Sequence, residues 1–354
     1  MDKILKTILN LAVLSTTKFP VGLQSYVEDL IRTIKNKSTE VCTIVICGQG
    51  GSGKTTLAKA IYHQIHSTFT EKSFIEDIGQ LSGIRGDLLL QEQLLSRVLK
   101  TKVKIRSIEM GRSMIRERLS GKRVLIVLDD VPEFDDASLV WECRHWLSGG
   151  SVIIITTRDE DLPSIHQVDT VFRMNLMNAE ESLELFSWHA FREAKPKEEY
   201  RDLAERVVAG CGGLPLALEV IGTCLGESKN ANAERNRLVL TLYNIPQPEV
   251  SHILKISIDG LPSQMVKDLF LDVCCFFVGK GRAYVTKILN GCGVAADSGI
   301  RVLIERNLIK VKKNNKLGMH PLIQQMGRDI HESSSSAWFS KFVLTNNTVR
   351  IHFV

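Results

Sequence analysis

The chain has 354 residues, of which 44% are hydrophobic and 24% charged, the composition of an ordinary globular protein long enough for two or three domains. Its net charge of +5 is mild and dispersed, so charge alone does not indicate nucleic-acid binding. Eight cysteines show neither a C-x-x-C pair nor a Cys/His metal spacing, which fits a reducing compartment, the cytoplasm or the nucleus. No run approaches 18 apolar residues, so no membrane span is expected.

Residues 1–19 place lysines ahead of a short apolar stretch, and we expect an amphipathic helix or linker there. A signal peptide is the alternative. It is disfavoured because Thr7 and Asn10 interrupt the stretch and no small-residue cleavage site follows it clearly.

Between residues 20 and 175, apolar segments alternate with segments of helical spacing. The apolar segments are uninterrupted, which indicates strands covered on both faces and hence a parallel sheet between helices. The expected strands are Val41–Cys47, Ser73–Ile78, Val124–Asp129, Ser151–Thr157 and Thr170–Met174. The expected helices lie near Lys54–His66, Leu88–Lys100, Glu109–Leu119 and Asp136–Leu147.

The segment GQGGSGKTT at residues 48–56 fits the phosphate-binding pattern G-x-x-x-x-G-K-[ST] at every fixed position. It lies between a strand and a helix, so its backbone N–H groups and the positive helix end can bind phosphate. Lys54 can reach the β- and γ-phosphates of a nucleotide, and the Thr55 hydroxyl can ligate Mg²⁺. A glycine-rich turn with a chance lysine is the alternative. The loop residues expected to bind nucleotide are Gly50, Gly51, Ser52, Gly53, Lys54, Thr55 and Thr56.

A second apolar segment, VLIVLDD at residues 124–130, ends in two aspartates, which is the Walker-B arrangement. Asp129 at the end of the strand can hold the hydration shell of Mg²⁺, and Asp130 can polarise an attacking water. A polar strand exit is the alternative, but this segment follows a phosphate-binding loop in the same sheet. No glutamate follows the first aspartate, so slow hydrolysis is expected.

A third apolar segment, SVIIITTRD at residues 151–159, places Arg158 at the carboxyl end of a buried strand. Guanidinium pairs with phosphate in a fork geometry, so Arg158 is a candidate for both γ-phosphate binding and catalysis. A surface salt bridge is the alternative for this residue.

From about residue 176 the strand signals stop. We expect a helical subdomain over residues 176–245, a winged-helix subdomain over 246–332 and an irregular tail over 333–354, with an exposed connection at 226–236. The segment LIKVKKNNKLGMH at 308–320 indicates a hairpin around Asn314-Asn315. The expected helices are Glu180–Phe191, Lys197–Cys211, Pro215–Leu225, Val250–Ile258, Ser263–Phe277, Arg282–Cys292 and Asp297–Arg306.

The hairpin carries a lysine cluster that could contact DNA phosphate in a winged-helix module. A solvated charged hairpin explains the same residues and is favoured, so no specific nucleic-acid partner is predicted. The cluster comprises Lys310, Lys312, Lys313 and Lys316.

In their order, the motifs resemble the NB-ARC domain of plant disease-resistance proteins, of the subclass that carries an N-terminal TIR domain. A P-loop alone is common to all P-loop proteins, whereas GLPLAL and FLDVCCFF at these separations are far more discriminating. The matching segments are FPVGLQSYVEDL (19–30), GQGGSGKTT (48–56), VLIVLDDV (124–131), IIITTRD (153–159), GCGGLPLALEVIG (210–222), FLDVCCFFVGKG (270–281) and GMHPLIQQMGRDI (318–330).

The resemblance implies a P-loop α/β domain followed by a helical and a winged-helix subdomain. It also implies an intracellular immune switch that is off with ADP and on with ATP, uses Mg²⁺, forms oligomers with related receptors and needs no membrane. By the same resemblance Val21 and Gly22 lie at the adenine, Pro215 packs on the nucleotide, and His320 reaches the ADP β-phosphate. Without the resemblance, Pro215 is equally a first-turn helix proline and His320 a structural histidine.

Some positions depart from the family pattern. Pro321 replaces the family's aspartate after His320, so an acidic hydrogen-bonding group is missing. Gln49 and Ser52 replace apolar P-loop residues at positions that supply mainly backbone, and Pro132 stands where an aspartate is common. No TIR domain precedes residue 20 and no leucine-rich repeats follow residue 330, from which we expect a truncated member, a fragmentary gene model or a splice form.

Three functions are compatible with these observations. The ordered motif series favours a nucleotide switch in plant defence with slow hydrolysis at most. The P-loop and the aspartate pair alone would also suit a turnover ATPase. The missing ends and Pro321 would suit an interaction fragment that acts on full-length relatives.

Overall fold

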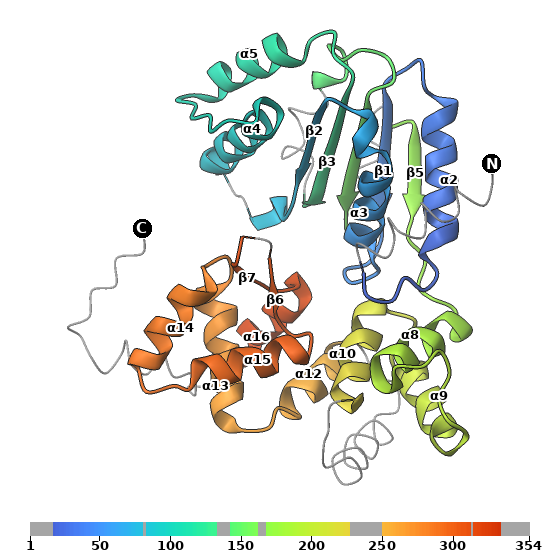
Figure 1. Ribbon diagram of the computed structural model, residues 1–354, viewed down its shortest axis with the longest axis vertical. Coiled ribbons are helices and arrows are strands. Elements are labelled where there is room, and N and C mark those ends of the chain that lie inside the picture. The colour runs from blue at the N-terminus through green and yellow to red at the C-terminus, as the bar shows by residue number, and fades with distance from the viewer. Residues whose placement is uncertain are drawn as a thin grey trace. The chain divides into compact units, whose positions relative to one another are not determined.

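The computed structural model describes residues 17–80, 83–132, 142–161, 168–226, 250–312 and 314–333. The chain divides into two compact units, residues 1–175 and 176–354, and each is described by itself (Figure 1). Several expectations fall outside the described residues: most of the N-terminal segment 1–19, most of the helix near 136–147, nearly all of the connection 226–236, the boundary at 245/246, and the tail after 333.

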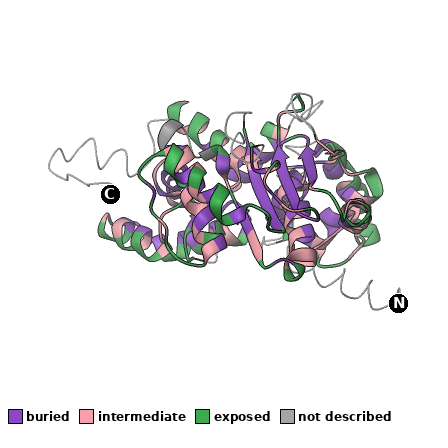
Figure 2. Ribbon diagram, turned by 90° about the horizontal axis from the view of Figure 1, so that it is seen from above, coloured by how far each residue is buried: buried purple, intermediate pink, exposed green. Residues whose placement is uncertain are grey.

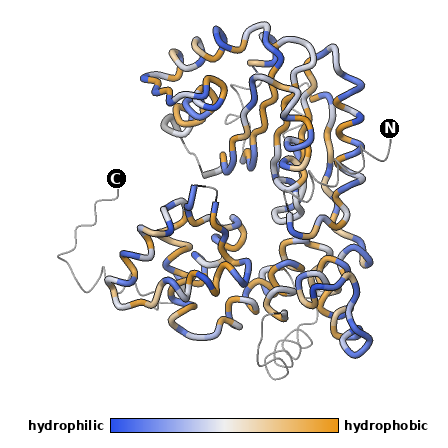
Figure 3. Tube along the Cα trace, viewed as in Figure 1, coloured by the Kyte–Doolittle hydropathy of each residue, from blue (hydrophilic) through white to orange (hydrophobic). Residues whose placement is uncertain are grey.

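The first unit is built on a sheet whose neighbouring strands all run parallel. Among the described residues its spatial order is β2-β3-β4-β1-β5, so β4 separates β1 from β3. All residues of β1 and β4 are buried, which is why these segments read as uninterrupted apolar runs, and the sheet is largely orange in Figure 3. The strands are β1 (Cys42–Cys47), β2 (Glu71–Ile75), β3 (Val124–Val131), β4 (Val152–Thr157) and β5 (Thr170–Arg173).

Helices cover both faces of this sheet, so that its strands form the buried layer seen in purple in Figure 2. On one face Leu57 belongs to the same buried apolar cluster as Ile44. On the other face Leu94 belongs to a second cluster with Ile126. The helices of the first face are α2 (Leu23–Asn36) and α3 (Lys54–Ile65), and those of the second are α4 (Gly83–Leu99) and α5 (Ile108–Leu119).

The second unit is mainly helical. It opens with a capping box, in which the Asn178 side chain accepts from the Glu181 N–H and the Glu181 carboxylate accepts from the Asn178 N–H. The elements are α8 (Ala179–Phe191), η4 (Glu198–Tyr200), α9 (Arg201–Gly210), α10 (Pro215–Gly226), α12 (Val250–Asp259), α13 (Gln264–Asp272), η5 (Val273–Phe277), α14 (Arg282–Gly291), α15 (Ala296–Glu305), β6 (Lys310–Val311), β7 (Leu317–Gly318) and α16 (Pro321–Ser333).

The expected hairpin is present as the antiparallel pair β6 and β7. Asn315 adopts a left-handed backbone with φ of 57° between the two strands, a conformation that asparagine tolerates better than most residues. Lys316 also forms a β-bridge with Gly281 ahead of α14.

The expected fold class is confirmed: a parallel P-loop sheet with helices, followed by a helical region and a winged helix. Single elements differ in detail. The second strand ends at Ile75 and a 3-10 turn at Ile78–Gln80 follows it. The helix expected over Ser263–Phe277 changes to a π-helical turn at Val273. Helix α2 was not among the expected helices.

Over the described part of the chain, no helix combines the length and the apolar character needed to cross a membrane.

A nearly buried carboxylate, Asp169, joins the amino ends of β1 and β5. It accepts hydrogen bonds from Lys37 Nζ at 2.7 Å and from the Thr43 N–H at 2.8 Å, and it pairs with Arg144 at 2.9 Å. Burial alone would raise the pKa of Asp169, but the hydrogen bonds from Lys37, Arg144 and the Thr43 N–H outweigh it and lower that pKa.

Replacing this carboxylate is expected to destabilise the first unit. Asp169→Ala leaves buried donors unsatisfied, and we expect a loss of about 2 kcal/mol in the free energy of unfolding at pH 7, measured by urea denaturation. Because the folded pKa is lowered, the contribution is present above the unfolded pKa of 3.8 and lost as pH falls below it, so the difference between the proteins should shrink in acid. Asp29→Ala is the control, since the Asp29 side chain is 60% exposed. Equal losses for both variants would contradict the assignment.

Candidate nucleotide-binding site

The glycine-rich loop lies between β1 and α3, at the carboxyl edge of the sheet. Gly48, Gly51 and Gly53 have φ of 142°, 86° and 100°, values that residues with a Cβ rarely adopt. Gly48 also approaches the neighbouring chain closely, since a Cβ there would lie 3.0 Å from the Met174 carbonyl oxygen. These positions therefore require glycine for backbone reasons.

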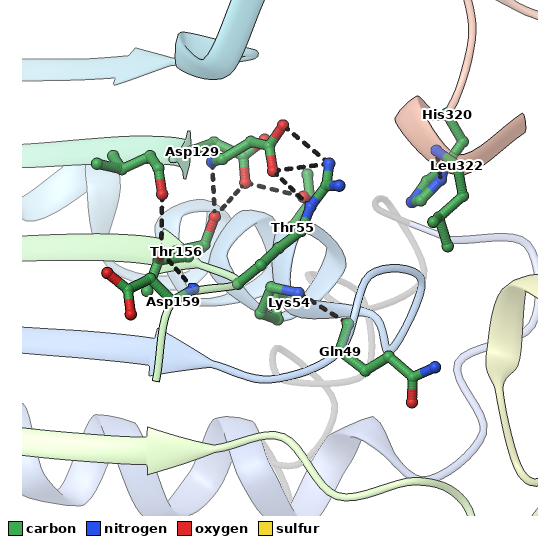
Figure 4. Close-up of polar contacts among 12 residues, drawn as sticks. Gln49, Lys54, Thr55, Asp129, Thr156, Asp159, His320 and Leu322 are labelled. Atoms are coloured by element: carbon green, nitrogen blue, oxygen red, sulfur yellow. Dashed lines mark hydrogen bonds and ion pairs between the residues drawn. The ribbon is translucent and has the colours of Figure 1, made fainter. Parts of the chain in front are cut away.

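The Lys54 ammonium is buried in this loop and bound to the loop's own backbone. Nζ donates to the Gly48 carbonyl at 2.7 Å. It also donates to the Gln49 carbonyl at 2.8 Å, the bond drawn in Figure 4. The residue is 7% exposed. Burial, followed by the nearby Arg158 charge, lowers the pKa of Lys54 from 10.5 to about 8. An anionic ligand would stabilise the charged form of a buried ammonium in this condition.

The Thr55 hydroxyl and the Asp129 carboxylate come together, as the sequence predicted. Thr55 Oγ1 donates to Asp129 Oδ1 at 2.8 Å, and Thr156 Oγ1 from β4 donates to the same oxygen at 2.6 Å (Figure 4). Asp129 is 3% exposed, and burial raises its pKa despite the two hydroxyl donors. The carboxylate thus joins α3, β3 and β4 at one point.

Both aspartates lie within a β-bulge. The register of β3 against β4 shifts between Leu128 and Val131, and Asp130 has a left-handed φ of 59°. Such a bulge re-aims side chains. Asp130 consequently pairs with Arg158, whose Nε and Nη2 donate to the two carboxylate oxygens at 3.2 and 3.3 Å. The two candidate catalytic residues are therefore bound to each other.

The donor set fits a magnesium nucleotide. Ser52 Oγ is buried and has no hydrogen-bond partner among the described residues, which leaves a donor in the loop. Thr55 and Asp129 offer the hard oxygen ligands that Mg²⁺ prefers. In the described ranges no group of three or more His, Cys, Asp or Glu could hold a metal by itself. This suits Mg²⁺, which usually keeps waters and takes further oxygens from a bound phosphate.

The remaining predicted site residues lie at helix starts. Val21 and Gly22 stand directly before α2 in the first unit, and Gly22 has a φ of 71°. In the second unit Pro215 is the first residue of α10, where its missing N–H leaves no bond unmade. Gly53 and Thr56 lie at the entry to α3.

His320 lies immediately before α16 in the second unit and acts as its cap. Its carbonyl accepts from the Gln324 N–H at 2.9 Å, and its Nδ1 accepts from the Leu322 N–H at 3.2 Å (Figure 4). Pro321 is the first residue of α16, a position at which proline is favoured. The departure from the family at Pro321 is thus compatible with the helix.

Thr156 was missed as a site residue by the sequence interpretation. Besides holding Asp129, its hydroxyl accepts from the Asp130 N–H at 2.9 Å. The sequence does show a hydroxyl residue at the end of the apolar strand 151–157. It does not show that this strand lies beside the strand that carries Asp129, so it could not predict the bond between them.

Family models match both units. The NB-ARC domain model matches residues 23–195, and the winged-helix domain model of Roq1-like disease resistance proteins matches residues 264–335. These matches define the class: the chain contains an NB-ARC domain with a P-loop nucleotide-binding fold, followed by a winged-helix domain.

The similar proteins are plant disease resistance proteins. Disease resistance protein RUN1 of Vitis rotundifolia is 41% identical over 88% of this chain and 23% of that protein. RPV1 of the same species is 40% identical over 88% of this chain and 22% of that protein, and TMV resistance protein N of Nicotiana glutinosa is 34% identical over 93% and 30%. The chain thus spans less than a third of these relatives, and it belongs to the NB-ARC family of plant disease resistance proteins.

Solved structures of low sequence identity share the fold. Cdc6p from Pyrobaculum aerophilum has a TM-score of 0.52 at 13% identity and covers 89% of this chain and 96% of its own. A signal transduction ATPase with numerous domains from Pyrococcus horikoshii has a TM-score of 0.50 at 16% identity and covers 91% of this chain and 45% of its own. Both support the P-loop fold alone.

The bond from Leu322 makes the His320 tautomer testable. A ring nitrogen that accepts a hydrogen bond carries no proton, so neutral His320 is expected to be protonated on Nε2. His66 is the internal control with the opposite tautomer, since its Nδ1 lies 3.0 Å from the His63 carbonyl and must donate. Long-range ¹⁵N–¹H correlation spectra at pH 8 distinguish the two forms. A proton on Nδ1 of His320 would contradict the capping role.

Proposed function

We propose that this chain is an ADP/ATP-binding molecular switch in plant innate immunity, off with ADP and on with ATP. The observation that carries the proposal is the buried pairing of Thr55 with Asp129 beside the buried Lys54 ammonium, within an NB-ARC domain. Related chains named as disease resistance proteins support the defence context.

In this proposal the P-loop residues bind the phosphates and the metal. Lys54 exchanges its bonds to the loop carbonyls for the β- and γ-phosphates, and the Ser52 hydroxyl gains a partner. Thr55 ligates Mg²⁺, and Asp129 holds the metal's water. A bound ligand of this kind would stabilise the native state by mass action.

Hydrolysis is proposed to be slow at most. Asp130 would have to polarise the attacking water, and Arg158 would have to reach the γ-phosphate. Both groups are held in a bidentate ion pair with each other. While Asp130 and Arg158 bind each other, neither group is free to act on a water or on the γ-phosphate, so this pairing favours nucleotide exchange over turnover.

The remaining assignments follow the family resemblance. Val21 and Gly22 would contact the adenine, while Pro215 and His320 would reach the nucleotide from the second unit. The bond from Leu322 to Nδ1 assigns the proton of the neutral ring to Nε2, and in this proposal the Nε2–H donates to the phosphate. A phosphate contact present only in the ADP form would bias the switch toward that form.

Oligomers with itself or with related immune receptors are the proposed partners, with no specific nucleic acid and no membrane. The cytoplasm is the proposed compartment, with the nucleus as the second.

Mass spectrometry of the co-purifying nucleotide tests the central claim, with ADP as the expected species. A kcat of about 1–1000 per second for ATP would instead favour a turnover ATPase. Partner binding that survives loss of the nucleotide would favour an interaction fragment.

Removing the Lys54 ammonium is expected to have opposite effects with and without ADP. In the nucleotide-free protein, Lys54→Met removes a buried charge and should stabilise by about 2 kcal/mol below pH 8. That gain should shrink between pH 8 and the unfolded pKa of 10.5, because the unfolded state holds more protons there and the parent protein gains stability. With excess ADP the order of melting temperatures should reverse, since only the parent binds.

Lys59→Met is the matched control on the same helix, since Lys59 forms a partly exposed ion pair with Glu76. It is expected to keep the stabilisation by ADP. If ADP does not change the melting temperature of the parent protein, the proposed function is contradicted.

Restoring the family's aspartate is expected to tighten ADP retention. Pro321→Asp places a carboxylate beside His320 in the first turn of α16, where the helix dipole favours it. We expect the ADP off-rate, measured with a fluorescent ADP analogue, to fall severalfold. Pro321→Ala removes the proline without adding the carboxylate and serves as the control. Off-rates that are equal in the parent, Pro321→Asp and Pro321→Ala would count against a role for this position.

A further inference from the structure

One short element, the π-helical turn η5 (Val273–Phe277), holds the chain on both sides of His320. π-helical turns are rare and occur frequently at functional sites. This turn continues α13 without a break and is buried at Val273, Cys274 and Phe277.

The end of η5 is satisfied by the His320 segment. A helix end leaves carbonyls without intrahelical partners. Gly279, five residues after Cys274, donates its N–H to the Leu317 carbonyl of β7 at 2.8 Å. The Cys274 carbonyl instead accepts from the Gln324 side-chain amide at 3.0 Å. The chain just after η5 therefore bonds to a residue before His320, and η5 itself bonds to a residue after it.

Packing around Cys274 reinforces these bonds. Its sulfur lies 3.3 Å from the Met319 sulfur. A Cβ on the buried Gly327 would collide with the Cys274 sulfur, so α16 approaches η5 closely. Met319 is 7% and Ile323 1% exposed, whereas His320 between them is only half-buried.

We propose that Gln324, through its bond to the Cys274 carbonyl, is a positioning residue that fixes His320 for its contact with a nucleotide phosphate. This inference rests on the proposed function, since it requires that contact. Met319 and Gln324 both contact Cys274 of η5, so His320 lies in a segment that is held before and after it. Loss of the Gln324 amide releases one end and leaves the imidazole chemistry unchanged.

Gln324→Met keeps the length of the side chain and removes the amide. We expect ADP to dissociate faster, on the order of fivefold, the equivalent of about one hydrogen bond. The probe is a fluorescent ADP analogue displaced by excess ADP from the whole chain. Gln325→Met is the matched control, because Gln325 is exposed and bonds to Asp329 at 2.8 Å on its own helix. It is expected to leave the rate unchanged.

A double-mutant cycle separates positioning from a structural role. If Gln324 acts through the ring, Gln324→Met should accelerate dissociation in the parent and have no further effect in His320→Ala. Equal acceleration in both backgrounds, or none in the parent, overturns the inference. Should Gln324→Met fail to fold by circular dichroism, Gln324→Ala takes its place in the same cycle, because it also removes the amide that bonds to Cys274.

The failure of the proposed function is recognised separately. His320→Ala alone is expected to accelerate ADP dissociation. An ADP dissociation rate in His320→Ala equal to that of the parent would contradict the proposed His320 contact, and with it the positioning role of Gln324. Faster ADP dissociation in His320→Ala, with no effect of Gln324→Met, would contradict the positioning role of Gln324 and leave the His320 contact standing.

Discussion

The Asp129 carboxylate, 3% exposed and held by the hydroxyls of Thr55 and Thr156, is the interaction on which the nucleotide-binding region depends. It joins the first turn of α3 to the ends of β3 and β4, three elements that meet only because β4 lies between β1 and β3. Burial raises its pKa, and the two hydroxyls supply no cation. Lys54 is in the complementary condition, a buried ammonium bound only to backbone carbonyls, with its pKa lowered to about 8. In both groups burial outweighs the nearby opposite charges, so a metal-bound phosphate would stabilise both charged forms and couple ligand binding to domain stability at this edge of the sheet.

That coupling bears on the choice between a switch and a turnover enzyme. A site whose charges are buried without full compensation stabilises any state that retains the nucleotide. Asp130 and Arg158, the groups that hydrolysis would need, are instead occupied by each other across the bulge. The buried groups thus favour retention of the nucleotide, whereas hydrolysis would require the Asp130–Arg158 ion pair to open. This difference is the physical basis for proposing exchange as the controlling step.

The sequence predicted the parts of this protein that depend on local pattern. Uninterrupted apolar runs predicted the strands, and spacing predicted Lys54 and Thr55 at the entry of α3, because both signals come from neighbouring residues. The pairing of Asp130 with Arg158 could not be predicted, since it depends on a one-residue bulge that sets φ of Asp130 to 59°. Thr156 and Gln324 were missed for the same reason: each acts on a residue distant in the chain, Asp129 or Cys274, and only the packed fold defines those pairs. Helix α2 was missed although the signal was present, since its buried residues Leu23, Val27 and Leu30 recur at helical spacing.

Pro321 changes how His320 is held, and the second unit shows what takes over that role. An aspartate after the histidine would offer a side-chain acceptor, whereas proline offers neither an acceptor nor an N–H. In this chain the imidazole Nδ1 is bound by the backbone N–H of Leu322, and the flanking residues are bound to η5. The bond from Leu322 requires an unprotonated Nδ1, whereas the bond from the Gln324 amide to the Cys274 carbonyl contains no titratable group. The position of the His320 segment therefore depends on the packing of α16 against η5 rather than on a carboxylate at position 321.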